Sequence, residues 1–139
     1  MKNIFVVLIT LFMLPATAQS SLESKGRSCS VVTLDQEWIP DSYHRGAKCV
    51  LKKSATGTIS VHETFDVSDR EHYNKENYIS FKVVLFKKGF DTMIAYSDES
   101  YSSLDVESVL AKCEKGDEII IVLNDSDSYS LPHHRITVI

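Results

Sequence analysis

The segment YISFKVVLFK, residues 78–87, decides how this sequence folds. Its apolar residues fall at every second position: Ile79, Phe81, Val83 and Leu85. A repeat of two is typical of a β-strand that buries one of its faces. Lys88-Gly89 then supplies a turn, and residues 90–96 predict the returning strand of a hairpin.

Outward from this segment, the chain predicts further short strands and one helix. β-branched or alternating stretches favour strands at residues 28–34, 47–53, 58–65, 118–123 and 135–139. Between residues 102 and 115 the period changes to that of a helix, because apolar side chains recur there as Val106, Val109, Leu110 and Cys113. Ser102 is expected to cap this helix and Gly116 to end it. The charged residues 66–77 predict a loop.

The resulting fold class is mainly β. About seven strands and one short α-helix, at about residues 103–114, with no β-α-β alternation, favour an antiparallel, immunoglobulin-like β-sandwich.

The N-terminus predicts export. Lys2 precedes an apolar run at residues 4–14, Pro15 interrupts it, and Ala16-Thr17-Ala18 has the spacing of a signal-peptide cleavage site. Eleven apolar residues are too few to span a bilayer as a helix. We therefore expect a signal peptide at residues 1–18, cleavage near Ala18, and a single domain at residues 19–139. The product would be periplasmic or secreted, with no membrane span after cleavage.

Composition excludes several classes of function. Fifteen Lys and Arg against 19 Asp and Glu give the chain a net charge of −4, and its basic residues are scattered along the sequence. Nucleic-acid binding is therefore not expected. With five glycines in all, the chain also has no phosphate-binding loop.

Three cysteines remain after signal cleavage. An oxidising compartment favours one disulfide, and Cys29 with Cys49 is the preferred pair because both lie in neighbouring predicted strands. Cys113 falls on the buried face of the predicted helix. The alternative is three buried, reduced cysteines.

No motif predicts a catalytic, cofactor or metal site. His133-His134 is expected in a solvated turn, without a third ligand nearby in the sequence. Residues 124–130 offer oxygen ligands at alternate positions, but they lack the Gly and Glu of a calcium-binding EF-hand and favour a turn. Trp38 and Tyr43, in a loop with Pro40, form the candidate binding patch; packing of Trp38 into the core is the alternative.

The segments at residues 57–60, 79–86 and 112–119 resemble the C-terminal periplasmic domain of the GldM gliding-motility and type IX secretion family of Bacteroidetes. The last of these contains Lys112-x-x-Lys115-Gly116-Asp117, similar to a Lys-x-x-Pro-Gly-Asp turn in that family, with Lys115 in place of the proline. The resemblance covers about residues 57–139. It implies an immunoglobulin-like sandwich in a periplasm, with other envelope proteins as its partners.

Together these observations predict a secreted, non-enzymatic module that acts through protein–protein contact in the cell envelope. One alternative is a periplasmic inhibitor or protector that inserts the loop at residues 66–77 into a hydrolase. The other is a small enzyme whose site is not recognisable in the sequence.

Overall fold

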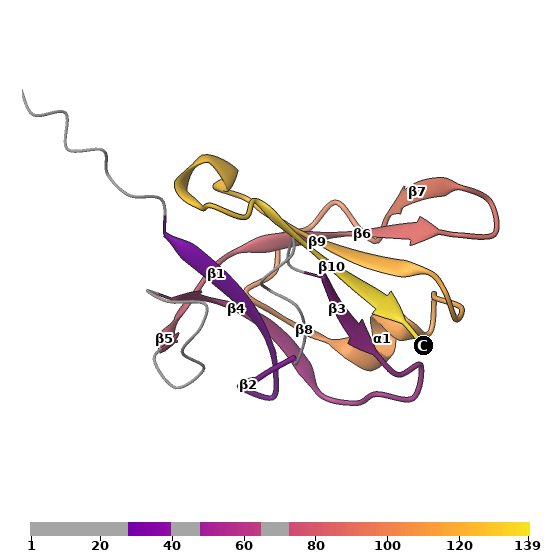
Figure 1. Ribbon diagram of the computed structural model, residues 1–139, viewed down its shortest axis with the longest axis horizontal. Coiled ribbons are helices and arrows are strands. Elements are labelled where there is room, and N and C mark those ends of the chain that lie inside the picture. The colour runs from indigo at the N-terminus through magenta and orange to yellow at the C-terminus, as the bar shows by residue number, and fades with distance from the viewer. Residues whose placement is uncertain (1–27, 40–47, 65–72) are drawn as a thin grey trace, which may run out of the picture.

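The computed structural model describes residues 28–39, 48–64 and 73–139, and their fold is mainly β. Two five-stranded sheets form a β-sandwich (Figure 1). The expected signal peptide at residues 1–18 and the candidate residue Tyr43 lie outside the described residues.

The first sheet is built around strand β1. β1 (Cys29–Leu34) lies between β2 (Glu37–Trp38) and β4 (Thr58–Thr64), and β4 also pairs with β5 (Tyr73–Tyr78) and with β8 (Ser103–Asp105). All of these pairs are antiparallel. Asp35 and Gln36, with φ of 51° and 65°, make the tight turn between β1 and β2.

The second sheet contains the strand on which the sequence analysis began. Its order is β3 (Lys48–Leu51), β10 (His133–Val138), β9 (Glu118–Leu123), β6 (Phe81–Lys87) and β7 (Thr92–Ala95). β6 and β7 form the predicted hairpin. β3 and β10 run parallel, so the sandwich is mixed rather than wholly antiparallel.

The core lies between the sheets, and period-two alternation selects its residues. Along β6, Phe81, Val83 and Leu85 are buried while Lys82 is exposed. β9 contributes Ile119, Ile121 and Leu123 to the same core. Each fully buried side chain of this size stabilises the fold by about 1.5–3 kcal/mol relative to an exposed one.

The helix is shorter than the sequence predicted. α1 spans Val106–Leu110, and residues 103–105 form β8 instead of its first turn. Asp105, not Ser102, is the N-cap residue, and its carboxylate accepts a hydrogen bond from the backbone N–H of Glu107 at 3.3 Å. The predicted apolar face is nonetheless buried, as Val106, Val109, Leu110 and Cys113. Gly116 takes the left-handed conformation, with φ of 95°.

The loop expected at residues 66–77 is contradicted at residues 73–77, whereas residues 66–72 lie outside the described residues. Residues 73–77 belong to β5, whose pairing with β4 aligns Tyr73 with Thr64 and Tyr78 with His62. Five of the six side chains of β5 are exposed, so the strand needs no apolar repeat of its own. It forms because it pairs with β4, whose side chains are mostly buried. The predicted strand at residues 78–87 is consequently two strands, β5 and β6, interrupted at residues 79–80.

Candidate interaction surface

The pair with the chemical groups of a nucleophile and a base is Ser30 with His134. Ser30 lies in β1 and His134 in β10, and their Oγ and Nε2 atoms are 2.7 Å apart. The hydroxyl of Ser30 also lies 3.4 Å from the carbonyl oxygen of Leu131. These contacts fit an imidazole that donates Nε2–H to Ser30 while Ser30 donates to Leu131, which leaves the hydroxyl unactivated.

Burial makes this pair structural. Both side chains are 0% exposed, so no substrate reaches them. Burial, and secondarily the neighbouring His133, lowers the pKa of His134 to about 4, so the ring is neutral near pH 7. His134 was expected in a solvated turn and instead lies in β10, where its contact with Ser30 joins the two sheets.

The other candidate ligands do not converge. His133 is exposed, and the segment at residues 124–130 folds as a short 3-10 helix, η2 (Ser126–Ser128), closed by a hydrogen bond from Ser128 to Asp125. Across residues 28–39, 48–64 and 73–139, no three His, Cys, Asp or Glu side chains are grouped to hold a metal ion. In the same residues, no helix is long and apolar enough to cross a membrane.

The three cysteines are thiols in the structure, with no disulfide among them. Cys29 lies in the first sheet and Cys49 in the second. Ser30 directs its hydroxyl to the second sheet, and because successive side chains of a strand alternate, Cys29 faces the other way. The Cys29–Cys49 bridge stays a prediction, and forming it would require rearrangement of β1.

Of the candidate patch, Trp38 is half-buried at the end of β2 and packs against the core. This matches the alternative in which the indole serves packing. Since Tyr43 is not among the described residues, binding at this loop remains a prediction.

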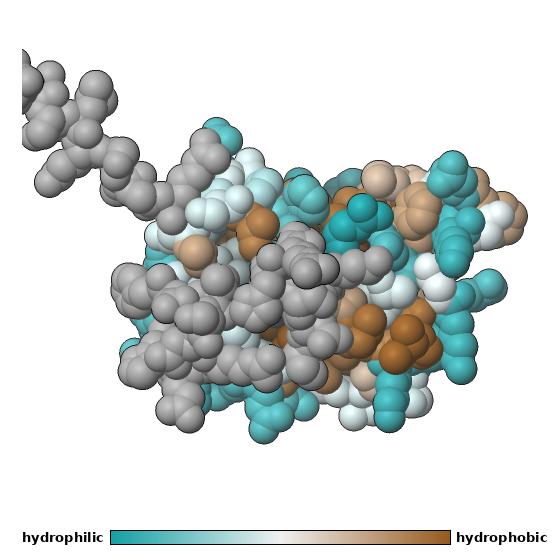
Figure 2. Space-filling view, in the orientation of Figure 1, coloured by the Kyte–Doolittle hydropathy of each residue, from teal (hydrophilic) through white to brown (hydrophobic). Residues whose placement is uncertain are grey.

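A stronger candidate surface is the β6–β7 hairpin, whose apolar side chains are exposed to solvent. Phe90 is 81% exposed, Met93 64% and Ile94 52%. The hairpin lies at one end of the molecule, where Figure 2 shows hydrophobic side chains beside hydrophilic ones. Phe90 lies in the turn, whereas Met93 and Ile94 are successive strand residues and extend to opposite faces of the sheet, so exposed apolar side chains flank the edge of β7 on both faces. We call β7 and its turn, residues 88–95, the hairpin surface.

The free edge of the hairpin surface is available for strand pairing. β7 is terminal in its sheet, and within the described residues it pairs only with β6. Tyr96 donates its N–H to Val83 at 3.0 Å, so the alternation of an antiparallel ladder directs the backbone groups of Met93 and Ala95 away from β6. β7 carries no charged residue or proline, the usual protections of an exposed edge.

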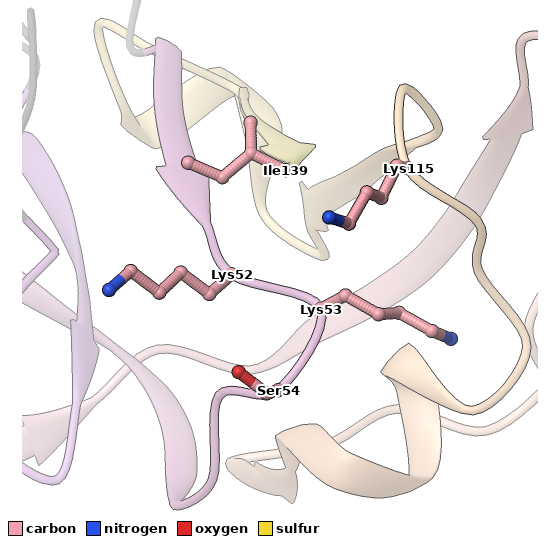
Figure 3. A pocket seen from close by; sticks show the side chains of 5 residues that line it. All are labelled: Lys52, Lys53, Ser54, Lys115 and Ile139. Atoms are coloured by element: carbon pink, nitrogen blue, oxygen red, sulfur yellow. The ribbon is translucent and has the colours of Figure 1, made fainter.

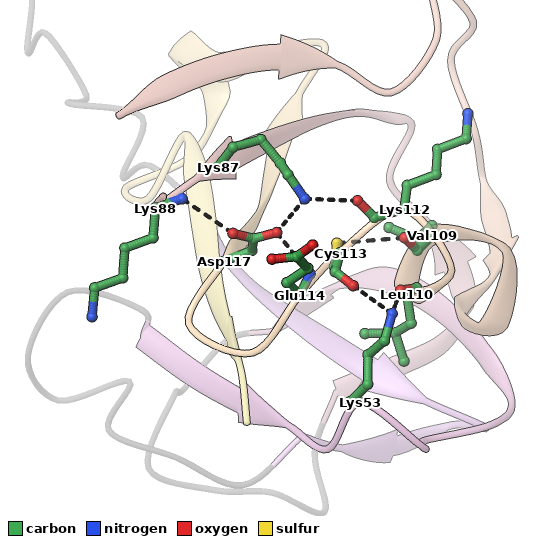
Figure 4. Close-up of polar contacts among 9 residues, drawn as sticks. All are labelled: Lys53, Lys87, Lys88, Val109, Leu110, Lys112, Cys113, Glu114 and Asp117. Atoms are coloured by element: carbon green, nitrogen blue, oxygen red, sulfur yellow. Dashed lines mark hydrogen bonds and ion pairs between the residues drawn. The ribbon is translucent and has the colours of Figure 1, made fainter. Parts of the chain in front are cut away.

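A buried carboxylate fixes the base of this hairpin (Figure 4). Asp117, 3% exposed, accepts hydrogen bonds from the ammonium of Lys87, from Lys88 N–H at 3.1 Å and from Glu114 N–H at 2.7 Å. Burial alone would raise the pKa of Asp117, but these hydrogen bonds outweigh it and lower that pKa. The hydrogen bond to Asp117 in turn raises the pKa of Lys87. Asp117 therefore joins the hairpin to the turn that follows α1.

Comparison of this chain with protein-family models, with curated proteins and with solved structures found no match. The residues that carry the resemblance to the GldM family have structural roles: Gly57 and Gly116 have positive φ, and Asp117 is the buried anchor.

Sequence reasoning predicted the hairpin but not its exposure. The pattern at residues 90–96 does not indicate whether a further strand follows β7 in the sheet. Thr92–Ala95 lacks the charged residues and proline that usually protect an exposed edge, so the local sequence carried no signal that β7 would be terminal in its sheet.

Proposed function

We propose that this chain is a secreted, non-enzymatic β-sandwich module that acts through protein contact in the bacterial cell envelope. In this proposal a partner protein adds a strand to β7. The observation that supports it is the uncharged edge of β7 next to exposed Phe90, Met93 and Ile94. Main-chain hydrogen bonds would give affinity, and the apolar side chains would give specificity.

The periplasmic location and the immunoglobulin-like character are part of the proposal. They are supported by the signal-like residues 1–18 and by the resemblance of residues 57–139 to the GldM-family domain. A catalytic role is less favoured, because both members of the Ser30–His134 pair are closed to solvent. Nothing in the described residues favours insertion into a hydrolase, since β5 uses residues 73–77 for pairing.

The test is to block the edge without altering the core. Ala95→Pro removes an N–H that points away from β6 and places a ring at the edge, whereas Ala95→Val keeps the N–H and serves as the matched control. In crosslinking from envelope fractions, we expect one partner to be recovered with the parent chain and with Ala95→Val, and lost with Ala95→Pro. The bound complex should also protect the amides of Met93 and Ala95 from hydrogen exchange. Recovery that is unchanged in Ala95→Pro would refute strand addition at β7.

A further inference from the structure

Six lysines gather at the same end of the molecule as the hairpin surface, although the chain as a whole carries a net charge of −4. They are linked in space: Lys87 bonds to the carbonyl oxygen of Lys112 at 2.9 Å, and the side chain of Lys88 lies against Gly116. Next to Gly116, Lys115 lines a hollow together with Lys52 and Lys53. These contacts place the hairpin lysines Lys87 and Lys88 next to the turn that carries Lys112 and Lys115, which leads to the hollow.

Three of these ammonium groups already have partners. Lys53 donates to the carbonyl oxygens of Leu110 and Cys113, Lys87 binds Asp117, and Lys112 lies 4.4 Å from the centre of the Tyr96 ring. The other three lysines are Lys52, Lys88 and Lys115. All three are exposed, and no carboxylate of the described residues pairs with any of them. Exposed lysines on one side of a molecule raise the local positive potential and favour an anionic ligand.

The hollow beside them is open and has an apolar side. It has a volume of about 550 Å³ and is lined by Lys52, Lys53, Ser54, Lys115 and Ile139. In Figure 3 the Lys52 and Lys53 side chains diverge, while Lys115 extends from the facing turn towards β3 and Ile139. Ile139 is half-exposed. The lining therefore offers spread positive charges together with an apolar contact.

We call the hollow lined by residues 52–54, 115 and 139 the lysine hollow. We propose that the lysine hollow, together with the neighbouring Lys88 outside its lining, binds an acidic polypeptide segment of the partner, with carboxylates at the lysines and an apolar side chain against Ile139. The inference rests on the proposed function, because Lys88 of the hairpin surface lies against Gly116, the neighbour of Lys115 in the lining of the hollow. The lining and its neighbour Lys88 contain lysines and no arginine. Arginine binds two oxygens of one phosphate at once, whereas each lysine ammonium is a single point charge, so these lysines suit carboxylates spaced along a chain better than one phosphate. A flat bilayer surface would contact protruding side chains first, whereas a polypeptide segment can enter a hollow. We therefore favour a polypeptide over a lipid surface as the ligand.

The probe is a fluorescein-labelled hexaglutamate peptide, titrated by anisotropy against the whole protein at low ionic strength. We expect saturable binding that weakens as salt is added. Lys52→Glu with Lys115→Glu should weaken it by about tenfold or more, because both reversals replace attraction by repulsion. The matched control, Lys75→Glu with Lys82→Glu, makes the same change in net charge on exposed sites of β5 and β6, and should change the affinity by less than about twofold.

Three results would overturn the inference: no saturable binding, equal weakening in the two double variants, or tighter binding of inorganic polyphosphate or of phosphatidylglycerol vesicles than of the peptide. The neutral pair Lys52→Gln with Lys115→Gln provides a second variant if the charge reversals disturb folding. Failure of this test leaves the Ala95→Pro experiment intact. Conversely, the peptide could bind while no partner depends on Ala95 for its recovery. That result would refute strand addition at β7 and leave the anion site supported.

Discussion

The imidazole of His134 is fully buried in one sheet, and its hydrogen-bond partner Ser30 lies in the other. Its pKa of about 4 in the folded chain is below the 6.5 expected when the chain is unfolded. Between about pH 4 and pH 6.5 the imidazole is protonated in the unfolded chain and neutral in the folded chain, so acid favours unfolding. Stability from this residue is therefore fully present above about pH 6.5 and is lost as the pH falls towards 4.

We expect the free energy of unfolding to drop by about 3 kcal/mol over this window because of His134 alone. Urea denaturation at a series of pH values measures it. His134→Gln should remove most of the dependence, and His134→Phe is a second variant that does not titrate. Burial also lowers the pKa of His62, so part of the slope should remain. His133→Gln is the control, since that side chain is exposed, and an equal loss of slope in it would contradict this account.

Among the three glycines that the structure describes, Gly57 is the one that the fold requires most strongly. Its φ is 118°, and a Cβ built there would lie 2.3 Å from a carboxylate oxygen of Asp35. That carboxylate also accepts a hydrogen bond from Thr58 N–H at 2.8 Å. Gly57→Ala should therefore cost about 2 kcal/mol of unfolding free energy, measured from the urea midpoint.

Gly89→Ala is its matched control. Nothing lies within 4 Å of a Cβ at position 89, so that change should stay within about 0.5 kcal/mol. Similar losses at the two positions would show that backbone freedom in general, rather than the Asp35 contact, sets the cost.

At the scale of elements, Asp117 holds three of them together: β6, the turn after α1, and β9. Asp117→Ala removes the acceptor of two backbone N–H groups and leaves Lys87 without its carboxylate. We expect a loss of about 3 kcal/mol, with faster hydrogen exchange at Lys88 and Glu114. Asp98→Ala, at an exposed position in the loop after β7, is the control. Slow exchange retained at both amides would show that the hairpin base does not depend on this carboxylate.

The sequence predicted elements whose hydrophobic period is strong, and failed where a neighbouring element decides the structure. Alternation along β6 and the uninterrupted run of β9 predicted buried strands, and both are confirmed. β5 has no apolar repeat, so only its pairing with β4 makes it a strand. Residues 103–105 extend as β8 for the same reason, because β4 has an edge there to pair with.

The candidate site was less predictable than the fold. Exposure of Phe90 and Met93 depends on β7 being terminal in its sheet, which is a property of the strand order. The lysine hollow joins residues from positions 52–54, 115 and 139. No local pattern links these positions, since tertiary folding alone brings them together.

At the scale of the whole molecule, the cysteines report how the sandwich opens. Cys49 and Cys113 are buried, Cys29 is partly exposed, and burial raises the pKa of the Cys113 thiol. Because the thiolate is the reactive form, native alkylation followed by mass spectrometry should label Cys29 first. Cys49 and Cys113 lie in one core and should react together, at the rate of global unfolding. A Cys29–Cys49 bridge would instead leave Cys113 as the single thiol that reacts in denaturant without reductant. Early labelling of Cys49 alone would show that β3 detaches before the two sheets separate.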